Sequence, residues 1–326
     1  ITASLVAENG EIIPLSKVYF TDHLDQLPTM ETIKQDVATM IEELKALKNA
    51  PLAEPYTGPA ILHPRAAGVF FHEIFGHRIE GHRLKSETDG QTFKEKPGQK
   101  VLAKQFNIYC DPTRKVFNDE ILNGYYQYDD QGIEAKKVNV VSKGILNTFL
   151  MSRSPLESVG NSNGHGRSQI GIGPVARQSN LIIEAEKQNS MQKLRSMLIK
   201  ECKAQKKEYG YYFMDVTGGF TRTDRYATNA FNIMPTLVYR IYTDGRPDEL
   251  VRGVDLIGTP LAMFAEITAA SEEQEVFNGI CGAESGSVPV SAISPGLLVR
   301  RIETQKKPVG QRQKEFPLLG RPKIEK

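Results

Sequence analysis

Phe71–His82 reads FHEIFGHRIEGH and holds three of the six histidines of the chain. A His-Glu pair in an apolar helix, followed about one turn later by another His, is how many zinc hydrolases carry their metal and their base. In those enzymes two imidazoles hold the ion, and the Glu beside the first His takes a proton from the metal-bound water. The stretch therefore indicates a metal site, with His72, Glu73 and His77 as its first candidates.

The spacing of the two histidines differs from the common metallopeptidase motif, which places them at i and i+4 on one helix face. His72 and His77 are five positions apart, so in a regular α-helix the second side chain would point well away from the first. A single π-type turn would realign them, and Gly76 is where the backbone yields most easily. We therefore expect a metal-carrying helix over residues 66–80 that is distorted just before His77.

A catalytic zinc usually takes three protein ligands and one water, so a third ligand is needed. Glu80 and His82 are the local candidates, and the distant ones are His23, His63, His165, Cys110, Cys202 and Cys281. Cys281 stands out because it lies between glycines in the segment 278–286, which predicts tight, exposed backbone. Thiolate is also a strong zinc ligand.

Five motifs follow one another along the chain in a fixed order. They are His72–Gly81 with its His-Glu-x-x-x-His pattern, Tyr128–Gly132 (YDDQG), Asn163–Arg167 (NGHGR), Val251–Gly258 (VRGVDLIG) and Cys281–Val290. Taken together, they resemble the TldD/PmbA family of metallopeptidases, also called modulators of DNA gyrase. The resemblance covers residues 25–303.

The resemblance implies a zinc-dependent peptidase that hydrolyses unfolded or flexible peptides. It implies that Zn²⁺ is held by His72, His77 and Cys281, and that Glu73 is the general base. It also implies a dimer, either a homodimer or a heterodimer with a family member. Some members lack the metal motif and serve as scaffold partners of an active subunit, an alternative that the four intact residues argue against. A zinc amidase or deacetylase is a second alternative, because its local chemistry would be the same.

Four further residues are candidates for supporting roles. Glu80 is expected behind a ligand, because a carboxylate often fixes the tautomer of a metal-binding imidazole. His82 competes for the metal or lies beside its ligands, and relatives tend to carry a different polar residue there. His165 and Arg167 are candidates for binding a substrate carboxylate or carbonyl; the alternative is that their glycine-rich stretch is simply a flexible loop.

The composition narrows the class of protein and its partners. The 326 residues are 40% hydrophobic and 25% charged, as in soluble globular proteins. A net charge of +2 gives no general attraction to nucleic acid, and no apolar run approaches the roughly 18 residues that cross a bilayer. Three cysteines without paired spacing argue against a disulfide scaffold. We therefore expect no nucleic-acid partner, no membrane partner and a cytoplasmic location.

The periodicity predicts an α+β fold. Two more helices are expected at 29–48 and 190–207, with Thr29 and Ser190 as their N-caps. Strands are expected at 136–150 as a hairpin and at 180–184, 211–216, 231–242, 250–257, 288–292 and 297–302. Tight turns such as Asp244-Gly245 favour antiparallel pairing. The plan is an antiparallel sheet or barrel with the metal-carrying helix and a few other helices packed on it.

Three segments are expected along the chain. Residues 1–50 would be the end of an N-terminal domain and a connecting helix, because members of the resembled family carry such a domain and this chain begins at Ile1. Residues 51–303 would form the catalytic metallopeptidase domain. Residues 304–326 hold seven Lys/Arg and two Glu, a net charge of +5, and would form a basic tail.

Overall fold

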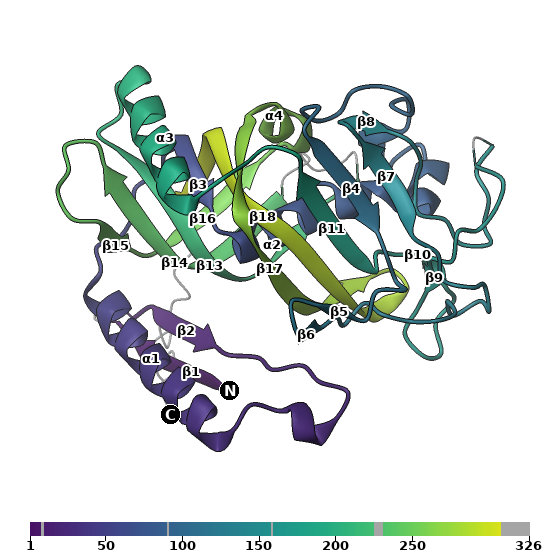
Figure 1. Ribbon diagram of the computed structural model, residues 1–326, viewed down its shortest axis with the longest axis horizontal. Helices are drawn as coiled ribbons and strands as arrows, with labels where there is room; N and C mark the ends of the chain where they lie inside the picture. The colour runs from purple at the N-terminus through teal and green to yellow at the C-terminus, as the bar shows by residue number, and fades with distance from the viewer. Residues whose placement is uncertain (8–9, 90, 158, 225–230, 308–326) are drawn as a thin grey trace, which may run out of the picture.

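A twelve-stranded mixed sheet forms the centre of the fold (Figure 1). The computed structural model describes residues 1–7, 10–89, 91–157, 159–224 and 231–307, and in them the expected α+β class is confirmed. The main path through the sheet runs β15-β14-β13-β3-β18-β11-β4-β7-β8. In that order the strands are Glu249–Val251, Phe231–Tyr242, Tyr209–Thr221, Thr57–Leu62, Gly286–Lys306, Asn180–Ala185, Phe106–Cys110, Val138–Ser142 and Ile145–Leu146.

β18 connects the parts of this sheet. It pairs antiparallel with β17 (Ile267–Ala283) along most of its length, and with β3 and β16 (Val254–Gly258) toward its C-terminal end. It also pairs parallel with β11. The β17–β18 hairpin turns at Gly286, which has φ +79°, a conformation that glycine adopts without steric cost. Strands as far apart in the sequence as β3 and β18 thus share one hydrogen-bonded layer.

Several strand predictions need correction. Residues 288–292 and 297–302 belong to one strand, β18, and the Pro295-Gly296 pair between them does not turn the chain. Instead, the Gly296 N–H donates to Ser271 Oγ at 2.6 Å. The expected strand at 250–257 is two strands, β15 and β16. β17 was not predicted, because its SEEQE stretch at 271–275 hides the alternation of a strand.

The pairing is also less uniform than expected. The sheet combines antiparallel pairs with parallel pairs, such as β13 with β3 and β11 with β18. Parallel neighbours need long crossover connections rather than hairpins. Hairpin-length turns in the sequence therefore could not reveal them.

α2 (Pro64–Ile74) is the helix that the sheet surrounds (Figure 1). Its side chains are buried apart from a half-buried Arg65, and most of them are apolar. Gly68 lets it approach β18 closely, because a Cβ at this position would lie 3.0 Å from the carbonyl oxygen of Ala292. Phe70 packs edge-on against Phe231 of β14, whereas Phe71 and Phe75 pack against Phe264.

The two other predicted helices are confirmed, together with their caps. α1 (Met30–Asn49) begins at Thr29, whose side chain accepts a hydrogen bond from Thr32 N. α3 (Met191–Ala204) begins at Ser190, which accepts from Lys193 N. α1 packs with β1 (Thr2–Val6) and β2 (Ile12–Ser16) through a hydrophobic cluster of its own, which includes Leu44 and Leu47.

The boundary predicted between residues 303 and 304 falls inside β18. β18 continues to Lys306, three residues into the segment expected to be a basic tail. The remainder of that segment, 308–326, lies outside the described residues. Among the helices that the structure describes, none is both long and apolar enough to cross a membrane.

Candidate metal centre

The end of α2 brings the two motif histidines together. The prediction of one distorted helix over 66–80 with a π-type turn is wrong: α2 ends at Ile74, and a 3₁₀ turn, η2 (Gly76–Ile79), follows. The Phe75 N–H still bonds Phe71 O at 3.0 Å, but the Arg78 N–H bonds Phe75 O at 2.9 Å. As a result, the His72 and His77 rings lie 4.9 Å apart, nearly perpendicular.

Arg78 explains why α2 stops where it does. The carbonyls of a last helical turn have no partner within the helix. The buried Arg78 guanidinium supplies one, since Nη1 donates to Glu73 O at 2.8 Å and to Ile74 O at 3.4 Å. The same nitrogen donates to Thr221 Oγ1 at 2.9 Å. Arg78 therefore caps α2 from within the motif and ties it to the end of β13.

Gly76 is required by packing. A Cβ at this position would lie 1.8 Å from Gln178 Oε1, a distance that no side chain can adopt. Gln178 Nε2 in turn donates to His72 O at 3.4 Å. Gln178 thus occupies the space beside the turn between the two histidines.

Cys281 reaches the histidines from β17. It pairs with Val288 across the β17–β18 hairpin and is buried, so the expectation of tight, exposed backbone is wrong. Its Sγ lies 3.4 Å from His77 Nε2. One ligand atom each from His72, His77 and Cys281 lie within 4.8 Å of one another. Burial alone would raise the pKa of the Cys281 thiol, but the two imidazoles hold that pKa well below its usual range.

Glu73 lies beside this cluster, and one of its carboxylate oxygens lacks a hydrogen bond among the described residues. Its Oε2 is buried, has no hydrogen-bond partner among the described residues and lies 3.9 Å from His77 Nε2. Burial raises the pKa of the carboxyl group, an effect that the neighbouring imidazoles oppose. A buried, unpaired carboxylate oxygen is costly unless something binds there.

Glu80 lies behind His77, on the side away from Cys281. Its Oε2 is 3.1 Å from His77 Nδ1 and 2.9 Å from Arg83 Nε. Burial would raise the pKa of Glu80, but His77 and Arg83 hold it well below its usual range. The carboxylate therefore accepts a hydrogen bond from Nδ1–H, which leaves His77 Nε2 free to face Cys281 and a metal.

Three other predicted residues lie elsewhere. His82 Nε2 bonds the Glu284 carboxylate and is not part of the ligand cluster. His165 is fully buried between Asn163 O and Ser179 Oγ, at 3.1 and 3.2 Å. Arg167 donates to Gln178 O at 2.6 Å and lies over the Tyr126 ring. Neither His165 nor Arg167 lines the cavity described next.

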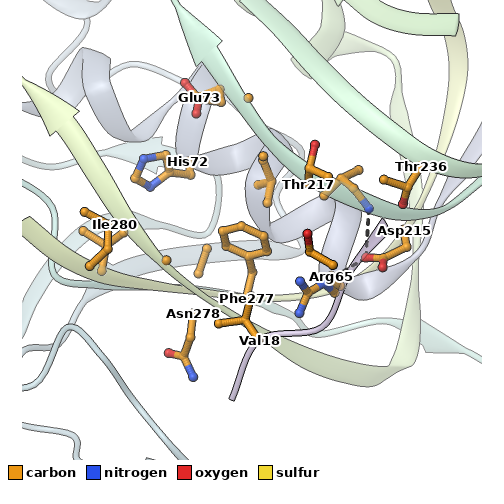
Figure 2. Close-up of a pocket in the computed structure, with 18 of the residues that line it drawn as sticks. Val18, Arg65, His72, Glu73, Asp215, Thr217, Thr236, Phe277, Asn278 and Ile280 are labelled. Carbon is orange, nitrogen blue, oxygen red and sulfur yellow. Dashed lines mark hydrogen bonds and ion pairs between the residues drawn. The ribbon is translucent and has the colours of Figure 1, made fainter. Parts of the chain in front are cut away.

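A cavity of about 930 Å³ opens onto the cluster. His72 and Glu73 face it from α2, and Phe277, Asn278 and Ile280 face it from β17 (Figure 2). The end of β13, residues 15–18 with Phe20, and parts of α1 and β14 also line it. Sequence reasoning missed Arg78 and the buried Arg177, which contacts Cys281. Only Arg78 carried a signal, because it lies within the motif, directly after His77.

The donor set of the cluster fits zinc. Two imidazole nitrogens and one thiolate sulfur are common zinc ligands, and three protein ligands leave one position open. The Glu73 oxygen beside them has no hydrogen-bond partner among the described residues, so it is available to a water or substrate group bound at that position. The residues present therefore suit a catalytic rather than a closed structural site.

Comparison with known proteins identifies the family of the chain. The sequence model of the PmbA/TldA metallopeptidase C-terminal domain matches residues 55–306. The chain belongs to this family. A metalloprotease from Archaeoglobus fulgidus is 30% identical over 272 residues, which are 83% of this chain and 58% of that protein. A zinc metalloprotease TldD homolog from Saccharolobus solfataricus is 26% identical over 305 residues, 92% of this chain and 61% of the relative.

Solved structures share the fold of this PmbA/TldA family member. TldE from Thermococcus kodakarensis superposes with a TM-score of 0.61 at 17% identity, over 84% of this chain and 55% of that one. A proposed modulator of a DNA gyrase from Thermotoga maritima superposes with a TM-score of 0.63 at 18% identity, over 93% of this chain and 61% of that one. The chain spans about half to three fifths of the length of the curated relatives it matches. Their names describe metalloproteases.

Proposed function

We propose that this chain carries the active site of a zinc-dependent peptidase, in which His72, His77 and Cys281 hold the ion. The observation that carries the proposal is the convergence of their ligand atoms within 4.8 Å beside a cavity. When bound, zinc acts as a Lewis acid and lowers the pKa of water toward neutrality. Glu73 Oε2 is the base that accepts a proton from the attacking water and later gives it to the leaving amine.

The substrate we propose is an unfolded or flexible peptide in extended form. Residues 277–284 line the cavity, and beyond Gln274 the described part of β17 pairs with β18 alone. At the other edge of β17, Gly279 O and Cys281 O already accept hydrogen bonds from Asn123 Nδ2 and Arg177 Nη2, so we propose that an extended chain bonds the remaining backbone groups of residues 277–283. A structure with a bound peptide analogue tests this, and an analogue without backbone pairing to the protein would contradict it.

We also propose that the chain works as a dimer, with a second copy or another family member, in the cytoplasm. The support is the family membership. Light scattering of the purified chain, alone and mixed with a relative that lacks the metal motif, measures whether a dimer forms. A monomer in both samples would contradict it.

Metal content and peptide hydrolysis test the central proposal. The chain prepared with zinc is expected to hold about one ion and to cleave a flexible peptide. His72→Ala is expected to lose both, whereas His23→Ala, which changes an exposed histidine, keeps both. A parent chain without zinc, or a His72→Ala variant with parental zinc and activity, would refute the proposal. Cleavage of acetyl-lysine or simple amides but not of peptides would favour the amidase alternative.

A further inference from the structure

Arg177 is a fully buried arginine that touches Cys281 directly. It follows the short strand β10 (Val175–Ala176), and its backbone N–H donates to His165 O at 2.9 Å. Its Nη2 donates to Cys281 O at 2.7 Å and to Cys281 Sγ at 3.2 Å. The backbone and the sulfur of the proposed ligand are therefore held by one nitrogen.

The same guanidinium faces Glu80 on its other side. Nε lies 3.4 Å from Glu80 Oε1, close enough for an ion pair though not aligned as a hydrogen bond. The other Glu80 oxygen lies 3.1 Å from His77 Nδ1. Arg177 and Glu80 thus form a buried pair that reaches two of the three proposed ligands, one through the cation and one through the carboxylate.

The remaining nitrogen fixes the hairpin that carries Cys281. Nη1 donates to Ser285 Oγ at 2.9 Å and to Gly286 O at 3.0 Å, at the β17–β18 turn. A guanidinium presents its donors in a rigid planar fork. Its contacts consequently set the position of the hairpin end relative to η2, which carries His77.

We propose that Arg177 is a positioning residue of the metal centre, which holds Cys281 Sγ where His72 and His77 converge and is coupled through Glu80 to the His77 ring. The inference rests on the proposed function. A buried guanidinium requires anionic partners, and here these are the Glu80 carboxylate and the sulfur of Cys281. Its N–H···S bond also draws electron density from the sulfur, which tunes the strength of the ligand.

Metal affinity and a cobalt spectrum test the role without relying on activity. Zinc affinity is measured by competition with a chromophoric chelator, and the thiolate-to-cobalt charge-transfer band is recorded after loading with Co²⁺. Arg177→Met is expected to weaken zinc binding about 10- to 100-fold and to move the band to longer wavelength, because the sulfur loses a donor. Arg252→Met is the matched control, since Arg252 bonds Ala50 O and Glu11 but none of the proposed ligands.

The outcomes separate this inference from the proposed function. A folded Arg177→Met variant with parental zinc affinity and an unchanged band overturns the role of Arg177 and leaves the peptidase proposal standing. A parent chain that binds neither zinc nor cobalt overturns the proposed function itself. If circular dichroism shows that Arg177→Met does not fold, Arg177→Lys carries the test, because it keeps a cation and loses the fork. Arg177→Lys is also expected to weaken zinc binding and to move the cobalt band to longer wavelength. Parental zinc affinity with an unchanged band in this variant overturns the inference.

Discussion

Cys281 Sγ lies 3.4 Å from His77 Nε2, although 204 positions separate the two residues. The contact joins the β17–β18 hairpin to the turn that ends α2. Neither element could hold a metal alone, since one supplies a sulfur and the other two imidazoles. The proposed chemistry therefore depends on how accurately the sheet positions Cys281 relative to His77.

Glu73→Ala should separate metal binding from hydrolysis. Glu73 is not among the three proposed ligands, and its Oε2 has no hydrogen-bond partner among the described residues. We expect the variant to retain zinc and to lose about 10²- to 10⁴-fold in peptide hydrolysis, as for a lost general base.

Zinc content and initial rates of peptide hydrolysis measure the two effects. Glu54→Ala, which changes an exposed partner of Lys306, is the control. Cleavage at the parental rate would show that the base has been assigned wrongly.

Gly76→Ala should destabilise the protein through a steric clash. The new carbon would lie 1.8 Å from Gln178 Oε1, so the turn before His77 or the Gln178 side chain must move. We expect a loss of about 1–3 kcal/mol in the free energy of unfolding, measured in urea. Gly173→Ala, where no atom lies within 4 Å of the added carbon, should change it by less than about 0.5 kcal/mol. Equal values for the two variants would contradict the packing role of Gly76.

Arg78→Met should loosen the end of α2. The substitution leaves the carbonyls of Glu73 and Ile74 without their side-chain partner, and each buried group left unpaired costs about 1–3 kcal/mol. Thermal and urea unfolding should report the loss, and zinc affinity should fall because His72 and His77 flank this turn. Arg195→Met removes an exposed ion pair with Asp248 and should cost less than about 1 kcal/mol. Arg78→Met with parental stability would mean that α2 ends for another reason.

His165 should make stability depend on pH. Burial lowers the pKa of His165 from 6.5 to about 4, so the imidazole stays neutral in the folded protein while it protonates in the unfolded chain. Its contribution is present above pH 6.5 and is lost as the pH falls toward 4, amounting to about 3 kcal/mol. His165→Gln should lose less stability than the parent when urea unfolding at pH 7 is compared with pH 4. The same loss in both proteins would contradict this origin.

Local sequence patterns predicted the parts of the fold that local interactions govern. Thr29 and Ser190 cap the helices where they were expected to, because a cap is satisfied by a backbone N–H three residues away. β14 also has its expected bounds, 231–242. By contrast, the two strands predicted at 288–292 and 297–302 are one strand, β18, and Ser271 of the neighbouring strand satisfies the Gly296 N–H between them.

The sequence by itself determined the chemistry that is available: two imidazoles, a carboxylate between them and a thiol far along the chain, within an α+β family. Only the tertiary structure decided how these groups meet. It ended α2 at Ile74 through the Arg78 cap, directed His82 to Glu284, and brought Cys281 to His77 with Arg177 behind it. The physical reason is that helix caps and periodicity depend on neighbours a few residues apart, whereas the approach of the β17–β18 hairpin to η2 depends on strand register and on buried contacts between distant segments.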